Sequence, residues 1–252
     1  MSNKYYVDGD KTMTPPNRAA ARASDNSDAG RPPSMQEWVV TSVRRLLLQG
    51  ELRPGQRVNQ GDLAARLGVS PVPVREALQV LSSSGLLKSE PGRGFWVPEP
   101  NSSDVAEIDL LARLLEHEAL MRGIPVITDD EIALMQDLYA ELVSLENSDD
   151  MVRKAQVHRE LHFVPFRSAG LHILEADLAR YWDHIDHHRV LYMFKDGDRA
   201  REALHQHESV IAACQTGDPE EVIRVMDIHR NFAMKHMLEQ VSDTHISQIK
   251  EM

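Results

Sequence analysis

Two histidines, His158 and His162, are four residues apart and could bind one metal ion together. Side chains at this spacing lie on the same face of a helix, within reach of a shared ligand. The chain holds 12 histidines among its 252 residues, which is a high count. Surface or core positions explain most pairs of this kind, so the pair by itself leaves both interpretations open.

Arg113 lies in an otherwise apolar segment, residues 110–115, where an unpaired charge would be costly. It therefore needs an anion. One candidate is a neighbouring carboxylate, Glu116 or Glu118. The other is the carboxylate of a small molecule, which the guanidinium would hold through two hydrogen bonds.

A second group of residues has side chains or positions suited to DNA: Gln60, Ser70, Pro71, Arg75, Arg93 and Gly94. Ser70 can cap a helix that opens with Pro71, and a helix N-terminus presents N–H groups and a positive dipole end to a phosphate. Arg75 follows about one turn later, and its planar fork can read a guanine edge. The alternative for Arg75 is an ion pair with Glu76 or Glu116.

Gln60 and Arg93 would make the remaining side-chain contacts. A glutamine amide can read adenine, which makes Gln60 a candidate for base recognition. Arg93 stands between Gly92 and Gly94 at the tip of a predicted hairpin. From there it could enter the minor groove or hold a phosphate.

The elements that must position these DNA contacts form a winged helix-turn-helix. Helical spacing of apolar residues predicts helices over 36–49, 59–68 and 70–85, with a tight turn between the last two. Short strands over 86–89 and 95–97 flank the turn at 91–94, which makes a wing. We assign 35–98 to this domain, with three helices and a small β-hairpin.

The rest of the chain has helical periodicity throughout, so the fold class is mainly α. Six helices are predicted, over 104–122, 129–146, 151–168, 171–194, 198–216 and 218–241. They would form a helical domain over 104–241, joined through a hinge at 99–103. Residues 1–34 are expected to be a disordered tail and 242–252 a C-terminal tail. His184, His187 and His188 fall in a polar run that is expected to face solvent.

The charge of the chain is unevenly distributed. The whole protein has a formal net charge of −11, yet residues 35–98 carry eight Lys or Arg against five acids. Residues 99–252 carry 15 Lys or Arg against 30 acids. A basic module joined to an acidic one suits a DNA-binding protein whose other domain repels DNA.

Cysteine content and hydropathy favour a cytoplasmic protein. The single cysteine, Cys214, lies among apolar neighbours and cannot form an intrachain disulfide. No apolar run is long enough for a membrane helix, and the N-terminus lacks the layout of a secretory signal.

The sequence resembles the GntR family of regulators, in the FadR-like branch with an FCD-type C-terminal domain. The resemblance is carried by 50–55, by 63–78 across the recognition region and by 85–95 in the wing. The C-terminal resemblance rests on 113–116, 161–162, His207 with 217–218, and His229. The six predicted helices favour the VanR-like subgroup. Pro71 and Gly61 stand where this family often has arginine, so the operator of a relative does not carry over.

The family resemblance implies a metal site and an effector site in the helical domain. FCD domains often hold a divalent ion through an acid and three histidines, and His162, His207 and His229 match the histidine positions. His158 stands where the acid would be. Four neutral nitrogens favour zinc or nickel over harder ions. The family also supports Arg113 as the residue that holds an effector carboxylate beside the metal.

We therefore expect a DNA-binding repressor rather than an enzyme. It would bind a palindromic operator as a homodimer and be released by a small organic acid bound in the helical domain. One alternative is a metal-responsive regulator in which the bound ion is itself the signal. A more distant alternative is a helix-bundle metal hydrolase with Glu160 or Glu208 as its base, but no enzyme signature accompanies these residues.

Overall fold

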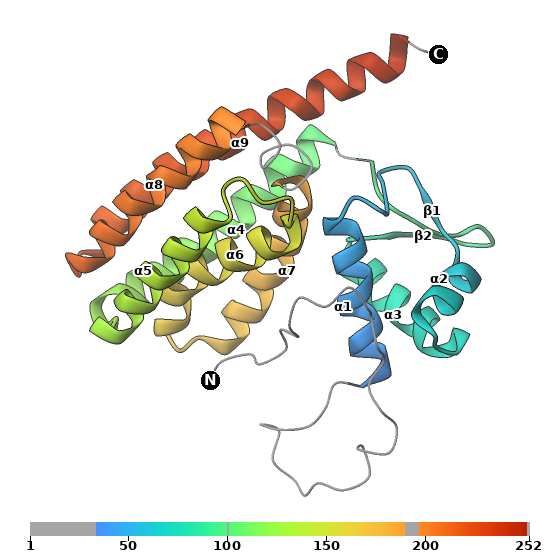
Figure 1. Cartoon of the computed structure of the whole chain (residues 1–252), viewed down its shortest axis with the longest axis horizontal. Coiled ribbons are helices and arrows are strands. Elements are labelled where there is room, and N and C mark those ends of the chain that lie inside the picture. Colours follow the sequence, from blue (N-terminus) through green and yellow to red (C-terminus); the bar gives the residue numbers. More distant parts are fainter. Residues whose placement is uncertain (1–33, 100, 190–196, 251–252) are drawn as a thin grey trace, which may run out of the picture. The chain divides into compact units, whose positions relative to one another are not determined.

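The computed structural model describes residues 34–99, 101–189 and 197–250, and it divides them into two compact units whose main boundary falls between Pro98 and Glu99 (Figure 1). The predicted N-terminal tail lies outside the described residues, apart from Ser34. Pro100, in the predicted hinge, also lies outside them. The unit boundary agrees with the predicted end of the DNA-binding domain.

The N-terminal unit is the predicted winged helix-turn-helix with one additional strand. Its helices and strands are α1 (Met35–Leu48), β1 (Arg57–Val58), α2 (Gln60–Leu67), α3 (Pro71–Ser83), β2 (Lys88–Glu90) and β3 (Gly94–Trp96). The strands form an antiparallel sheet in the order β1-β3-β2. The predicted hairpin is β2 with β3, and sequence analysis missed β1, which has only two residues.

Local capping explains where the first two helices begin and end. At the start of α1, Ser34 Oγ accepts from the Glu37 backbone N–H at 3.2 Å, and Glu37 Oε2 accepts from the Ser34 N–H at 2.6 Å. This reciprocal pair is a capping box, so Ser34 is the N-cap of α1 rather than part of the predicted tail. As predicted, the Asn59 side chain caps α2, and Gly68 ends that helix in the left-handed region at φ 65°.

One apolar core joins the three helices of the N-terminal unit to its sheet. Val43 of α1 and Val74 and Leu78 of α3 are fully buried, and Phe95 of β3 packs into the same cluster. Leu87, just before β2, is also buried in it. The wing is therefore attached to the helices through residues at both of its ends.

The C-terminal unit contains six α-helices in its described part, in agreement with the predicted count. They are α4 (Ser102–Gly123), α5 (Asp129–Ser144), α6 (Met151–Ser168), α7 (His172–His188), α8 (Gly197–Gln215) and α9 (Pro219–Lys250), with a short 3-10 helix, η2 (Ile124–Val126), after α4. α4 packs against α6, α7 and α9, and α8 packs against α5 and α9. Among the described residues, no helix is both long and apolar enough to cross a membrane.

Several predicted boundaries in this unit differ from the structure. α9 continues to Lys250, so most of the predicted tail 242–252 is helical. α4 begins at Ser102 with Asn101 as its cap, which places the end of the predicted hinge inside a helix. The predicted helix 171–194 is described as α7 up to His188, and residues 190–196 lie outside the described residues.

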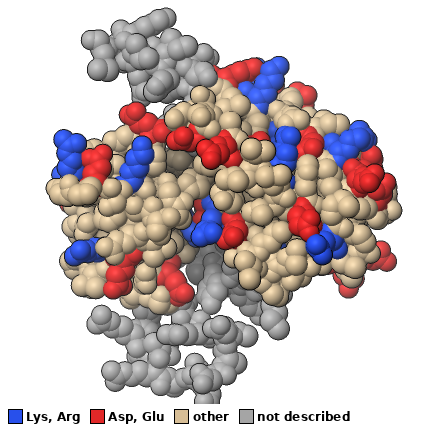
Figure 2. Space-filling model, turned by 180° about the vertical axis from the view of Figure 1, so that it is seen from behind, with Lys and Arg blue, Asp and Glu red and all other residues tan. Residues whose placement is uncertain are grey.

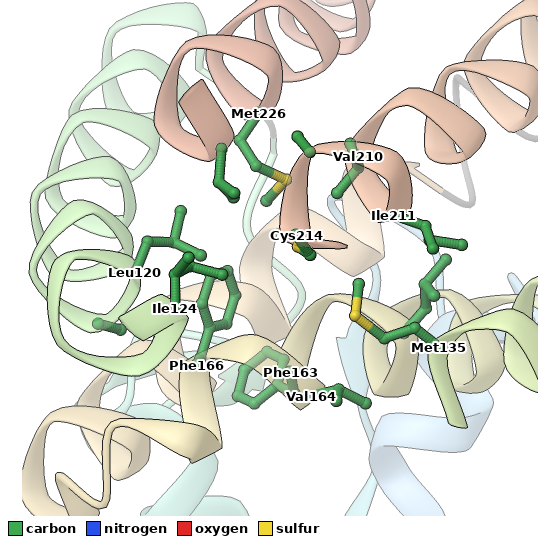
Figure 3. Close-up of a cluster of buried hydrophobic side chains, with 14 of the residues drawn as sticks. Leu120, Ile124, Met135, Phe163, Val164, Phe166, Val210, Ile211, Cys214 and Met226 are labelled. Atoms are coloured by element: carbon green, nitrogen blue, oxygen red, sulfur yellow. The ribbon is translucent and has the colours of Figure 1, made fainter. Parts of the chain in front are cut away.

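The core of the helical unit collects apolar side chains from α4, α5, α6, α8 and α9 (Figure 3). Leu120, Phe163, Phe166 and Met135 are among its fully buried members. Cys214 is 1% exposed, and burial raises the pKa of its thiol to about 12. Cys214 is therefore a small buried residue whose thiol stays protonated at neutral pH.

Gly123, the last residue of α4, allows the backbone of α6 to approach closely. A Cβ atom at this position would lie 2.3 Å from the carbonyl oxygen of Pro165 and 3.0 Å from the backbone nitrogen of Ala169. Both contacts are with backbone atoms, which cannot move aside as a flexible side chain could. Only glycine fits this α4–α6 contact.

Candidate DNA interface and metal centre

The start of α3 offers a small set of contacts for a phosphate. Ser70 occupies the N-cap position and is exposed, but its side chain makes no capping hydrogen bond, contrary to our expectation. Pro71 and Pro73 have no N–H group, so Val72 supplies the backbone donor of the first turn. The Ser70 hydroxyl is thus free of the helix and able to bind another group.

Arg75 projects from α3 into solvent. The described residues give it no hydrogen bond and no ion pair, and its side chain is exposed. The alternative partner Glu116 accepts a hydrogen bond from Trp182 Nε1 and forms an ion pair with Arg230. An exposed arginine with no acid partner among the described residues is available to read a base edge.

The other candidate contacts lie at the start of α2 and on the wing. Gln60 is the first residue of α2 and is half-buried. Arg93 forms an exposed ion pair with Glu90 at 3.3 Å, which is too weak to hold the side chain in place. Gly94 has φ 98° and begins β3, so the tip of the wing depends on glycine there. On the face drawn in Figure 2, acidic and basic side chains are interspersed.

Four buried histidines meet inside the C-terminal unit. His158 and His162 come from α6, His207 from α8 and His229 from α9. One ligand atom from each lies within 4.8 Å of the others, and each side chain is at most 5% exposed. The structure therefore brings together all four predicted metal ligands, from three helices that are far apart in sequence.

Hydrogen bonds to the outer nitrogens set the orientation of two of these rings. Nδ1 of His207 donates to the backbone oxygen of Leu204 at 3.0 Å, and Nδ1 of His229 donates to Gln206 Oε1 at 3.1 Å. Because Nδ1 carries the proton in both rings, Nε2 keeps its lone pair. Such outer hydrogen bonds are typical of histidines that bind a metal.

The inner nitrogens of His162 and His207 are close enough to share one hydrogen bond. Nε2 of His162 lies 3.0 Å from Nε2 of His207, and Nδ1 of His162 is buried with no hydrogen-bond partner in the described part of the chain. Because Nε2 of His207 keeps its lone pair, the Nε2–H group of His162 donates to it at that distance, and a metal ion would take the place of this shared proton. The donor set is four imidazoles, which fits zinc or nickel.

Burial keeps the four imidazoles neutral at neutral pH. Desolvation lowers the pKa of His207 to about 4. Desolvation likewise lowers the pKa of His158, His162 and His229 well below its ordinary value, and the positive charge of Arg189 adds to the effect. Neutral imidazole is the form that binds a metal ion, so the cluster needs no deprotonation step at pH 7.

Arg113 makes its side-chain contacts with α9. Its Nη2 donates to Asn231 Oδ1 at 2.5 Å, and its Nε lies 3.5 Å from Asp227 Oδ1, both on α9. Neither of the expected neighbours is its partner, because Glu118 pairs with Arg122 and Glu116 with Arg230. The anion that compensates Arg113 is therefore Asp227, and an effector role for Arg113 stays a prediction.

A cavity of about 100 Å³ borders the histidine cluster. Its lining includes His158, His207 and His229, together with the basic residues Lys154, Arg189 and Arg201 and the acid Glu146. Arg113 is absent from this lining. Arg189 and Lys154 were not predicted as site residues, and the polar run before Arg189 was expected to face solvent.

That polar run is partly buried instead. Asp186 is 4% exposed and His187 is 8% exposed. Asp186 accepts from Arg189 at 2.7 Å through one oxygen and from Arg159 at 3.3 Å through the other. A signal was available in the sequence, since Trp182, Ile185 and Arg189 recur at helical spacing and give α7 an inward face.

Neither acid considered for a hydrolase acts at the cluster. Glu160 pairs with Arg167, at 2.6 Å. Glu208 accepts a hydrogen bond from the hydroxyl of Tyr139 at 2.7 Å. A catalytic metal needs a general base close to its open position, and both carboxylates are instead bound to residues outside the cluster.

Comparison with known protein families identifies both units. Residues 35–97 match the bacterial regulatory proteins of the gntR family, and residues 109–232 match the FCD domain. These matches cover the winged helix-turn-helix and the bundle that holds the four histidines. The helical unit is thus an FCD domain, as the resemblance predicted.

Curated relatives and solved structures agree with the family matches. The HTH-type transcriptional regulator McbR of Escherichia coli K12 is 28% identical over 188 residues, 74% of this chain and 85% of that protein. The HTH-type transcriptional repressor RspR of the same organism is 26% identical over 226 residues, 86% of this chain and 91% of that protein. The structure of E. coli McbR/YncC has a TM-score of 0.75 at 24% identity, covering 83% of this chain and 99% of that one.

A second solved structure has the same fold at lower identity. A GntR regulator from Rhodococcus sp. RHA1 has a TM-score of 0.69 at 22% identity, covering 82% of this chain and 99% of the other. The family matches and the curated relatives place the chain among transcriptional regulators rather than enzymes, and the solved structures show the same fold. The chain belongs to the GntR family of DNA-binding transcriptional regulators, in the FadR-like branch with an FCD domain.

Proposed function

We propose that this regulator is a cytoplasmic repressor that binds a palindromic operator as a homodimer and is released by a small organic acid. The effector would bind in the FCD domain, beside a divalent ion held by His158, His162, His207 and His229. The observation that carries this proposal is the buried four-histidine cluster with a cavity at its side. The predicted domains, 35–98 for DNA and 104–241 for effector and dimer, keep their assigned roles.

The proposed dimer follows from the size of the DNA-binding surface. A single winged helix-turn-helix offers few base contacts, so twofold symmetry is the usual way to reach specific affinity. α4 carries exposed apolar side chains on one face, with Leu110 55%, Leu114 59% and Met121 44% exposed. Burying this face against a second copy would remove it from water.

The proposed metal would be bound by nitrogen atoms alone. Zinc or nickel suits four imidazoles better than manganese, which prefers oxygen ligands. A bound ion would supply a Lewis-acidic anchor for an effector carboxylate. The chain itself would orient the metal ligands and make room for the effector. Outer hydrogen bonds fix the rings of His207 and His229, and the cavity beside them can hold a small molecule.

The test combines metal analysis with operator binding. Metal-stripped and zinc-loaded protein would be compared by thermal unfolding and by binding to a duplex selected from a random-sequence library. We expect zinc to raise the melting temperature, and one acid from a panel of organic acids to weaken duplex binding. If Arg113 holds the effector carboxylate, as the family resemblance implies, the same acid should no longer weaken duplex binding in the Arg113→Ala variant.

The same experiment distinguishes the proposed acid-responsive repressor from the metal-responsive alternative. If chelation alone abolished duplex binding and no organic acid had an effect, the ion would be the signal and the effector part of the proposal would fail. If zinc raised the melting temperature of neither the parent protein nor the Arg113→Ala variant, the metal part would fail.

A further inference from the structure

The first turn of α3 presents an apolar side chain to solvent. Residues 71–74 are proline, valine, proline and valine, so this turn carries no charged or hydrogen-bonding side chain. Val74 is fully buried in the core of the N-terminal unit, whereas Val72 is 64% exposed. Among the described residues of that unit, Val72 is the most exposed large apolar side chain. The side chains of this turn can therefore contribute only an apolar contact to a partner.

Val72 shares one face of α3 with Arg75 and Gln79. These residues follow it by three and seven positions, a spacing that places side chains on one side of a helix. All three are exposed, and Glu76 beside Arg75 is exposed as well. Neither Arg75 nor Gln79 forms a side-chain hydrogen bond or ion pair within the described residues. The face thus combines an apolar side chain with two side chains that are available to hydrogen-bond with bases.

The apolar group that DNA offers to such a face is the methyl group of thymine. In the major groove the 5-methyl group of thymine lies among hydrogen-bond donors and acceptors, and it distinguishes thymine from the other bases. Helix-turn-helix domains place the N-terminal residues of their second helix against base edges in this groove. α3 lies inside the match to the gntR regulatory proteins. A single exposed valine needs no partner in general, but Val72 stands on the same face as an arginine that is available for DNA.

We infer that Val72 recognises a thymine methyl group in the operator, within about two base pairs of the base that Arg75 reads. Three residues rise about 4.5 Å along a helix, and successive base pairs are about 3.4 Å apart. Burying one methyl group against an apolar side chain should change affinity about threefold to fivefold. The inference rests on the proposed function, because it names the feature of the operator that the first turn of α3 would recognise.

The test replaces each thymine of the selected duplex, one at a time, with deoxyuridine, which lacks only the 5-methyl group. Binding to the full-length protein is measured by fluorescence anisotropy for the parent and for Val72→Ala. We expect one replacement in each half-site to weaken binding of the parent about threefold to fivefold. Val72→Ala should bind the thymine and deoxyuridine duplexes equally at that position. Comparing the two proteins on the same pair of duplexes removes any effect of deoxyuridine on the DNA itself.

Two further variants show whether the effect belongs to the first turn of α3. Val80 is 40% exposed and lies about 12 Å further along the helix, so Val80→Ala should keep the full sensitivity to deoxyuridine. Val72→Ile keeps a branched apolar side chain and should keep the sensitivity too. Since Val72 and Val80 are both exposed, neither alanine variant should change the melting temperature much. Repeating the selection with Arg75→Ala locates the base that Arg75 reads.

Three outcomes would overturn the inference while leaving the proposed repressor in place. In the first, no thymine replacement affects the parent and Val72→Ala differently. In the second, Val80→Ala loses the sensitivity to deoxyuridine as fully as Val72→Ala does. In the third, the sensitive thymine lies several base pairs from the position that changes in Arg75→Ala. Selection of no duplex by the parent protein would instead contradict the proposed function, and the inference with it.

Discussion

Acid should destabilise the metal-stripped protein through its four buried histidines. In the folded state the pKa of His207 is about 4, and burial lowers the pKa of the other three well below its ordinary value. The unfolded chain therefore binds more protons than the folded one once the pH falls below about 6.5. Stability rises with pH where the unfolded state binds more protons, so it must fall as the solution is acidified.

The size of the effect follows from the difference in bound protons. A histidine that stays neutral in the folded state costs about 1.3 kcal/mol of unfolding free energy between pH 7 and pH 5.5. Four such residues give about 5 kcal/mol, which is comparable to the whole stability of a marginal domain. The loss should begin near pH 6.5 and continue down to the folded pKa values.

Urea unfolding of metal-stripped protein at pH 7.0, 6.2 and 5.5 would measure this loss. His158→Asn removes one of the four groups and should reduce the pH dependence by about a quarter. His172→Gln changes an exposed histidine outside the cluster and is the control. A flat profile in the parent protein, or equal slopes in the parent and His158→Asn, would refute the assignment of neutral buried imidazoles.

Three further substitutions test the two sites and the α4–α6 contact. Arg75→Ala should cost about 1–3 kcal/mol in binding the selected duplex and much less on a random duplex, measured by fluorescence anisotropy; equal losses on both would contradict base reading. Gly123→Ala should lower the unfolding free energy by about 1–3 kcal/mol, because its Cβ would meet backbone atoms of α6, whereas Gly197→Ala has open space and should not. His158→Asp places an oxygen ligand in the cluster and should shift metal preference from zinc toward manganese in equilibrium dialysis; an unchanged ratio would show that residue 158 is not a ligand.

The sequence was most informative where function depends on local pattern. Asn59 and Gly68 delimit α2, and Pro71 opens α3, because capping and proline preferences act within a few residues. The spacing of four residues indicated His158 and His162, but only the match to a family pattern added His207 and His229, since nothing in local spacing connects His162 with either. The structure then supplied the burial and the orienting hydrogen bonds.

The arginines show where the sequence could not decide. Arg113 stands among leucines and was expected to need an anion, and the structure provides Asp227, which is 114 positions away in the chain. Arg189 follows a polar run, yet it is buried at the cavity because Trp182 and Ile185 turn that side of α7 inward. Tertiary packing determines which arginine lines the cavity, and hydrophobic periodicity alone does not predict which one it is.

Coupling between the cavity and the DNA-binding unit would involve α4, the helix that follows the unit boundary. Glu116 of α4 is 1% exposed, accepts from Trp182 Nε1 at 2.6 Å and forms an ion pair with Arg230. Arg230 also pairs with Asp109 of α4 at 3.1 Å and follows His229 directly in α9. If ligand binding moved His229 or Trp182, the movement would therefore act on α4 through these buried charges.

Glu116→Gln weakens this link while retaining an oxygen that can accept from Trp182. Zinc affinity and duplex affinity should stay close to those of the parent protein, because Glu116 contacts neither site. The factor by which an effector weakens duplex binding should fall, since that factor measures the coupling free energy between the two sites. Anisotropy titrations with and without the active acid give the factor directly. If Glu116→Gln kept the full factor, α4 would not transmit the signal through this contact, and the shared acid would serve stability alone.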